Sequence, residues 1–159
     1  MELGGILMAE EPKAVEQEDR ISDLSDGVLN HILSRLPTRS AVATGRLSRR
    51  WRHLWKHLSV LNFSEDYCFK FKSFALLVNG IFALLHNPRA IRKFHLNCIY
   101  SVDDDDNFLA YSVDAWVRSI IGPHLQELDL NIIYFEDDGG PEFKLPLSLF
   151  TSTSLVSLK

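Results

Sequence analysis

Cysteine is scarce in this chain of 159 residues, which has only two, and no apolar stretch is long enough to cross a membrane. A spanning helix needs roughly 18 or more consecutive apolar residues, so the sequence predicts no membrane partner. The start, MELGGILMAEEPK, has only a short apolar patch with no basic residue before it, unlike a secretory signal peptide. We therefore expect an intracellular protein of the nucleus, the cytoplasm or both, with Cys68 and Cys98 as free thiols.

Sequence motifs of the common enzyme classes are also missing. The chain has no glycine loop that cradles phosphate, no paired cysteines and no G-x-S-x-G elbow. The four aspartates at 103–106 lack the glycine that a calcium loop needs, so they are interpreted as a solvated loop. His53 and His57 lie one helical turn apart, but no cysteine or carboxylate nearby completes a zinc site. The sequence thus predicts a protein that is not an enzyme, with no metal and no cofactor.

The net charge of −4 is distributed unevenly along the chain. Residues 1–18 contain five acidic residues and one basic residue. Residues 19–60 contain three acidic and eight basic residues, and residues 61–159 contain thirteen acidic and eight basic residues. A short, acidic and polar segment cannot bury a core, so we interpret residues 1–18 as a disordered acidic tail. The sequence therefore divides into this tail, a basic segment and a second acidic segment.

In the basic segment, apolar residues recur at helical spacing in three short stretches between residues 24 and 58. The first stretch follows Ser25, which can cap a helix, and it ends at Pro37, because the residue before a proline avoids helical backbone angles. Thr38 or Ser40 is expected to cap a second helix, and Ser48 a third. This punctuation predicts three short helices.

The third of these helices, at residues 46–57, is amphipathic. Leu47, Trp51 and Leu54 lie along one face, and basic residues fill most of the rest. Such a helix can enter a nucleic-acid groove, or its basic side can be solvated while its apolar side packs. A segment of about 40 residues rarely buries enough surface to fold alone. We therefore expect the following segment or another protein to cover part of its apolar surface.

Residues 19–63, DRISDLSDGVLNHILSRLPTRSAVATGRLSRRWRHLWKHLSVLNF, resemble the F-box motif in the form common in plant proteins. Ser25 and Gly45 depart from the family pattern, in which proline and serine are usual at these positions. Because serine can still cap a helix, Ser25 is expected at most to weaken the docking of the motif on its partner. The positions that match are Leu24, Asp26, Leu29, Ile32, Leu33, Leu36, Pro37, Ala41, Val42, Leu47, Ser48, Arg49, Arg50, Trp51, Arg52, Leu54 and Trp55.

The resemblance implies a three-helix module that binds the Skp-type linker protein of a ubiquitin ligase and, through it, a cullin scaffold. The family is not itself catalytic. Its members are substrate-recognition adaptors, which hold a target protein near the enzyme that modifies it. The residues that the resemblance assigns to the linker contact are Leu24, Leu29, Ile32, Leu36, Pro37, Val42, Leu47 and Trp51.

The segment at 61–159 begins with a helical pattern and continues with a repeated strand pattern. Apolar residues recur at helical spacing from Phe71 to Leu85, although Gly80 makes one unbroken helix less favourable. The stretches at 91–96 and 125–130 then share the spacing L-x-x-L-x-L, and a third copy opens at 155. The residues predicted to form the strand core are Ile91, Phe94, Leu96, Leu125, Leu128, Leu130, Leu155 and Leu158.

This spacing resembles the strand signature of leucine-rich repeats, which stack short parallel strands. Residues 59–63 can form an earlier, degenerate strand, and residues 113–121 a helix behind the sheet. We expect a mixed fold, α+β or α/β, with a small three-helix F-box module at 19–60 and the start of a leucine-rich-repeat solenoid at 61–159. Because such arrays need three or more units, a truncated or short product with a partial repeat region is expected.

Two other functions stay open beside the adaptor. The helix at 46–57 suits a helix-turn-helix-like nucleic-acid-binding protein, and the apolar surface suits an interaction protein with no ligase role. The acidic net charge and the aromatic residues on the apolar side argue against nucleic acid as a partner. Salt dependence distinguishes the two kinds of binding, because phosphate contacts weaken steeply with salt.

Overall fold

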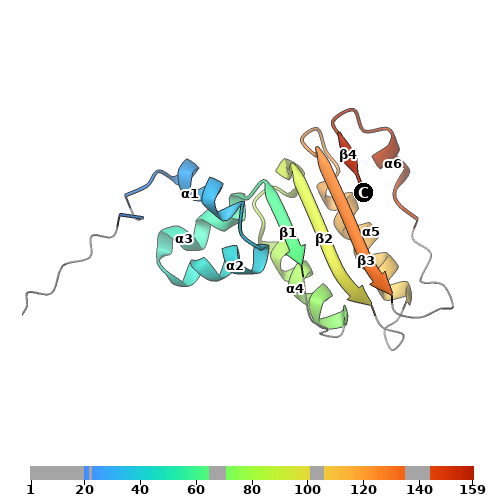
Figure 1. Cartoon of the computed structure of the whole chain (residues 1–159), viewed down its shortest axis with the longest axis horizontal. Coiled ribbons are helices and arrows are strands. Elements are labelled where there is room, and N and C mark those ends of the chain that lie inside the picture. Colours follow the sequence, from blue (N-terminus) through green and yellow to red (C-terminus); the bar gives the residue numbers. More distant parts are fainter. Residues whose placement is uncertain (1–19, 22, 65–70, 101–105, 135–143) are drawn as a thin grey trace, which may run out of the picture.

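The computed structural model describes residues 20–21, 23–64, 71–100, 106–134 and 144–159. The predicted acidic tail, Cys68 and the aspartates at 103–105 lie outside these residues. Figure 1 shows a group of short helices beside a four-stranded sheet, so the predicted mixture of helices and strands is confirmed. Within the described ranges, none of the helices has the length and apolar character needed to span a bilayer.

The helical group, called here the helical module, is built from three α-helices and two 3-10 turns. Ser25 caps the first helix as predicted, with its hydroxyl accepting a hydrogen bond from the backbone N–H of Val28 at 3.5 Å. The elements are α1 (Asp26–Leu33), α2 (Thr38–Ala43), η1 (Thr44–Arg46), α3 (Arg49–Leu54) and η2 (Trp55–His57).

The predicted caps of the second helix are wrong, whereas Ser48 occupies the predicted cap position of the third. Pro37 precedes α2, and neither Thr38 nor Ser40 caps it, because both lie inside the helix. Ser48 stands at the start of α3 but makes no side-chain cap bond. Thr38 has a different role: it is 1% exposed, and its hydroxyl accepts a hydrogen bond from the backbone N–H of Asn62 at 2.7 Å. The prediction failed because a threonine can serve a distant strand as well as its own helix.

The rest of the chain forms a parallel sheet whose strand order follows the chain. In Figure 1, helices α4 and α5 lie behind the sheet, so one face is covered and the other is open. The elements are β1 (Val60–Ser64), α4 (Phe71–Leu84), η3 (Pro88–Ala90), β2 (Lys93–Tyr100), α5 (Asp106–Ile120), β3 (Glu127–Tyr134), α6 (Leu147–Phe150) and β4 (Ser157–Leu158).

The strand register aligns equivalent apolar residues across the sheet. Leu61 pairs with Phe94, Phe94 with Leu128, and Leu128 with Leu158. Because side chains alternate between the two faces of a strand, this row points towards the helices and forms the centre of the core. Aromatic rings fill the space between the row and the helices: Phe63, Phe71, Phe74, Phe82, Phe94, Phe108 and Trp116.

The repeated strands begin two residues later than the sequence pattern suggested. Ile91 and Leu125 precede β2 and β3, and both are buried. Among the other predicted core residues, Phe94, Leu96 and Leu128 are buried, Leu130 and Leu155 are half-buried, and Leu158 is 41% exposed. Burial therefore decreases towards β4, a strand of two residues.

Two further expectations concern the helices behind the sheet. Helix α4 is unbroken from Phe71 to Leu84, because Gly80 lies on its open side with no atom near the place of a side chain. Helix α5 contains the predicted apolar stripe and ends at Ile120, before Gly122-Pro123. The degenerate strand expected at 59–63 is present as β1.

Candidate protein-binding surfaces

The first candidate surface lies on the helical module, where helix α1 has two apolar faces. Leu29 and Leu33 point into the core, whereas Val28 and Ile32, one turn apart, are exposed. Leu47 is 70% exposed and lies between η1 and α3, because the helix predicted at 46–57 is interrupted there. The module therefore carries three large apolar side chains outside its own core, which makes it a candidate binding surface.

The eight residues assigned to the linker contact occupy three kinds of position. Leu29 is 0% and Trp51 7% exposed, so they pack inside the module and can support a partner contact only by holding the helices in place. The half-buried residues are Leu24, Leu36 and Val42, and the exposed ones are Ile32, Pro37 and Leu47.

Sequence reasoning missed Val28 as a surface residue. Val28 lies four positions before Ile32 in the sequence, and residues four apart share one face of a helix. The sequence could not show which of the two apolar faces of α1 packs inward, because that depends on α3, where Trp51 and Leu54 cover Leu29 and Leu33 within one buried cluster.

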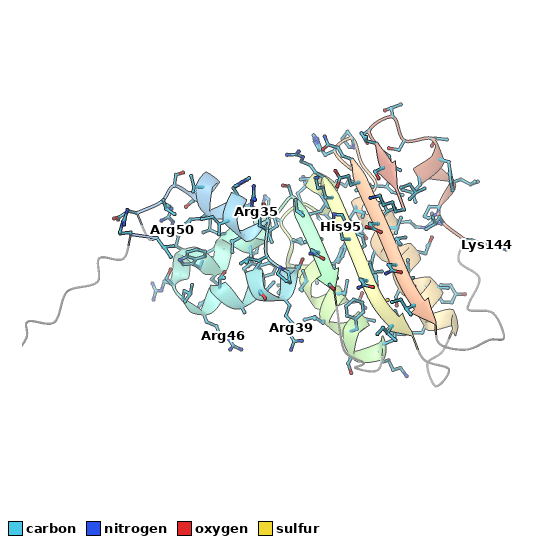
Figure 2. All side chains as sticks on the ribbon, in the orientation of Figure 1. Arg35, Arg39, Arg46, Arg50, His95 and Lys144 are labelled. Carbon is cyan, nitrogen blue, oxygen red and sulfur yellow. The ribbon has the colours of Figure 1, made fainter. Side chains whose placement is uncertain are left out.

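The helical module also carries several arginines. Arg50 joins α3 to the start of α1: its guanidinium donates to the Asp26 carboxylate, with a shortest N–O distance of 2.6 Å, and to the backbone oxygen of Leu24. Figure 2 shows Arg39 and Arg46 on the lower side of the module, pointing away from its core. Arg50 therefore holds α1 against α3, and Arg39 and Arg46 add positive charge to the surface of the module.

The helical module is attached to the sheet by hydrogen bonds from several elements. Besides the Thr38 bond to β1, the backbone N–H of His86 donates to the oxygen of Lys56 at 3.0 Å. The N–H of Arg92 donates to the oxygen of Ser59 at 2.7 Å. These bonds give the two candidate surfaces a defined relative position.

The second candidate surface is the open face of the sheet. The register places polar residues side by side: Asn62, His95 and Asp129 in one row, and Ser64, Asn97 and Asn131 in the next. With Lys159 they line an open hollow of about 600 Å³. The strand alternation that buries the apolar row turns these polar residues outward.

Charged groups on this face are paired across β2 and β3. The ammonium of Lys93 lies 2.6 Å from the Glu127 carboxylate, and this hydrogen bond lowers the pKa of Glu127 below its usual value. His95 has Asp129 at 3.5 Å and Glu127 at 3.9 Å. Asn131 donates to Asn97 at 3.1 Å. The face is therefore suited to hydrogen bonding and ion pairing with a partner.

The described part of the chain offers little reactive chemistry. It holds no group of three side chains that could ligate a metal ion. Cys98 is a free thiol, as expected, but it is buried in β2, and desolvation raises the pKa of its thiol to about 12. A thiol with so little thiolate is a poor nucleophile. Both surfaces are thus suited to binding.

Comparison with known families first defines the class of protein. A family model described as "F-box domain" matches residues 21–63, which contain the whole helical module and most of β1. No solved structure matches the chain.

Curated proteins of Arabidopsis thaliana then narrow the class. The chain is 38% identical over 148 residues to an F-box/FBD/LRR-repeat protein, covering 92% of this chain and 31% of the relative. It is 34% identical over 147 residues to F-box/LRR-repeat protein 13, with the same coverage of both chains. The resemblance seen in the sequence is confirmed, because the chain is similar over most of its length to plant F-box proteins that have leucine-rich repeats. It spans about a third of the length of these relatives.

Proposed function

We propose that this F-box protein is a substrate-recognition adaptor of a Skp-cullin-F-box ubiquitin ligase. The F-box match and the names of the relatives support an adaptor role that is not catalytic. The single observation that carries the finer proposal is the exposed apolar group Val28, Ile32 and Leu47, on a module whose own core is already filled by Leu29, Leu33 and Trp51. This group is the proposed contact for the Skp-type linker protein.

The geometry of the module is suited to that contact. Protein interfaces place a few apolar anchors at the centre and charged groups at the rim, and the anchors supply most of the binding energy. In the module, Ile32 and Leu47 are exposed apolar side chains, and exposed arginines such as Arg39 and Arg46 lie on the same module. Leu36 and Val42, which are half-buried, can add contact area without unfolding the helices.

We propose further that the parallel sheet and its helices are the first units of a leucine-rich-repeat solenoid. Successive strands are similar in their register, since Leu61, Phe94 and Leu128 occupy equivalent positions in β1, β2 and β3. In this proposal the polar open face contributes to holding a target protein. The linker then connects the target to the cullin scaffold, and ubiquitination is accelerated by proximity. The proposed location is intracellular, in the nucleus or the cytoplasm.

The test is binding of the full chain to a purified Skp-type linker protein. We expect Ile32→Asp and Leu47→Asp each to weaken the complex at least 30-fold, which corresponds to about 2 kcal/mol, the size of an interface hot spot. Leu76→Asp is the matched control, because Leu76 is 68% exposed on α4, away from the module. Thermal unfolding should be similar for all three variants.

A wild-type chain that does not bind the linker would contradict the proposal, as would equal losses in all three variants. A salt titration tests the nucleic-acid alternative in the same experiment. An apolar interface should bind with nearly the same affinity at 50 and 500 mM salt, whereas phosphate contacts weaken by orders of magnitude.

A further inference from the structure

A second hollow, of about 510 Å³, lies where the helical module meets the start of the sheet. We call it the junction hollow. It is separate from the exposed apolar group and shares only Lys93 with the polar face of the sheet. Its size falls within the range of about 300–1,000 Å³ typical of small-molecule sites. The residues that line it are Gly27, Asn30, His31, Ser34, Arg35, His57, Leu58, Ser59, Val60, Arg92 and Lys93.

The lining of the junction hollow is basic. The three basic side chains are those of Arg35, which follows the first helix, and of Arg92 and Lys93, at the entry to β2. No carboxylate is among the described residues that line the hollow. Figure 2 shows Arg35 at the boundary between the helices and the strands. Bringing these cations together costs electrostatic free energy, which an anion in the hollow would offset.

Within the described part of the chain, neither arginine is hydrogen-bonded to a carboxylate in this region. The guanidinium of Arg35 lies 3.3 Å from Nε2 of His31, and that of Arg92 lies 3.4 Å from the amide oxygen of Gln126. Lys93 differs, because Glu127 pairs with it. Arg35 and Arg92 therefore keep their charge available for a ligand.

We propose that the junction hollow binds a phosphate group. Arginine forks match the spacing of phosphate oxygens and donate two parallel hydrogen bonds, which suits Arg35 and Arg92. His57 supplies a further polar group on the wall. The group comes either from a small phosphorylated compound or from a phosphorylated side chain of a target protein. Because α1 and β2 both contribute, an occupied hollow would also stabilise the junction between the module and the sheet.

The test is calorimetric titration of the full chain with inorganic pyrophosphate, at constant ionic strength and without the linker protein. We expect one site per chain. Arg35→Gln and Arg92→Gln should each weaken binding at least 10-fold, whereas Arg92→Lys should recover part of the affinity. Arg46→Gln is the control, since it removes the same charge from an arginine that points away from the hollow.

A second titration identifies the source of the phosphate. A phosphoserine peptide that binds more tightly than pyrophosphate, with the same arginine dependence, indicates a phosphorylated target, and the reverse order indicates a small compound. No binding of either probe would overturn the proposal, and so would equal losses in the Arg46→Gln control. Because the linker is absent, failure of the adaptor proposal leaves this result unaffected.

Discussion

The helical module and the sheet differ in what they expose. On the module, Val28, Ile32 and Leu47 present apolar side chains to water, whereas the open face of the sheet presents rows of amides and charged groups such as His95 and Asp129. The difference follows from backbone geometry. A strand turns alternate residues to opposite faces and separates the two chemistries, whereas three short helices cannot bury every apolar residue of a 3.6-residue period.

The comparison indicates that the two surfaces are suited to different forces. The module should hold its partner through apolar contact, which depends little on salt. The sheet face should hold a partner through hydrogen bonds and ion pairs, which depend on salt and pH. Variants that act on one region and leave the other unchanged test this division.

The largest loss of stability is expected from a substitution in the core behind the polar face. Phe94 is fully buried, with the rings of Phe63 and Phe82 at centroid distances of 5.9 and 6.1 Å. Phe94→Ala should lower the free energy of unfolding by about 3–5 kcal/mol, because it removes apolar contact and leaves a cavity. Urea unfolding measures this free energy. Leu76→Ala, at an exposed position, should change the free energy of unfolding by less than about 0.5 kcal/mol. A similar loss in the two variants would contradict the assigned core.

The second prediction concerns the reactivity of the Cys98 thiol, which burial should lower strongly. With a pKa of about 12, the thiolate fraction at pH 8 is on the order of 1,000-fold below that of an exposed cysteine. Iodoacetamide should therefore alkylate Cys98 very slowly in the folded chain and rapidly in urea, as followed by peptide mass mapping. Fast alkylation in the native state would show that β2 opens readily.

The junction between the two regions should have an intermediate effect. Thr38→Val keeps the shape of the side chain but leaves the N–H of Asn62 without its acceptor. We expect a loss of about 1–3 kcal/mol in unfolding free energy, with faster hydrogen exchange at Asn62. Thr44→Val is the control, because the hydroxyl of Thr44 donates only to Ala41 in its own helical turn. Equal losses would show that Thr38 has no special role between module and sheet.

The smallest effect is expected on the polar face, at the Lys93–Glu127 pair. Because the pKa of Glu127 is lowered in the folded chain, the pair stabilises the fold above the usual carboxyl pKa near 4.5. The contribution is lost as the pH falls through the lowered pKa. The wild type should therefore be slightly more stable than Glu127→Gln at pH 7, and this difference should disappear near pH 3 and in high salt. A difference that persists at pH 3 would contradict this account.

Much of the fold follows from local signals in the sequence. Ser25 and Pro37 mark the first helix, and the spacing of Phe94 and Leu96, and of Leu128 and Leu130, indicates the two long strands. These signals are readable because they act within a few residues along the chain. They are sufficient to locate the F-box and the repeated strands from the sequence alone.

The remaining features depend on contacts between distant segments. Thr38 bonds a strand 24 residues away, and Arg35 and Arg92 share a hollow only because the module rests against β2. The inward face of α1 was also hidden, so Leu29 and Trp51 were grouped with the linker contact although both are buried. Spacing along one element cannot reveal such contacts, since the second partner is set by the three-dimensional arrangement.

The order of the strands has a consequence for how the chain folds while it is being synthesised. Each strand pairs with the one that precedes it in the chain, and none is inserted between earlier strands. A ribosome delivers the chain from its N-terminus at about 5–20 residues per second, which is slow compared with local folding. The helical module can therefore form first and offer β1 as a template, and each later strand can be added to an edge that already exists. Synthesis and sheet assembly proceed in the same direction.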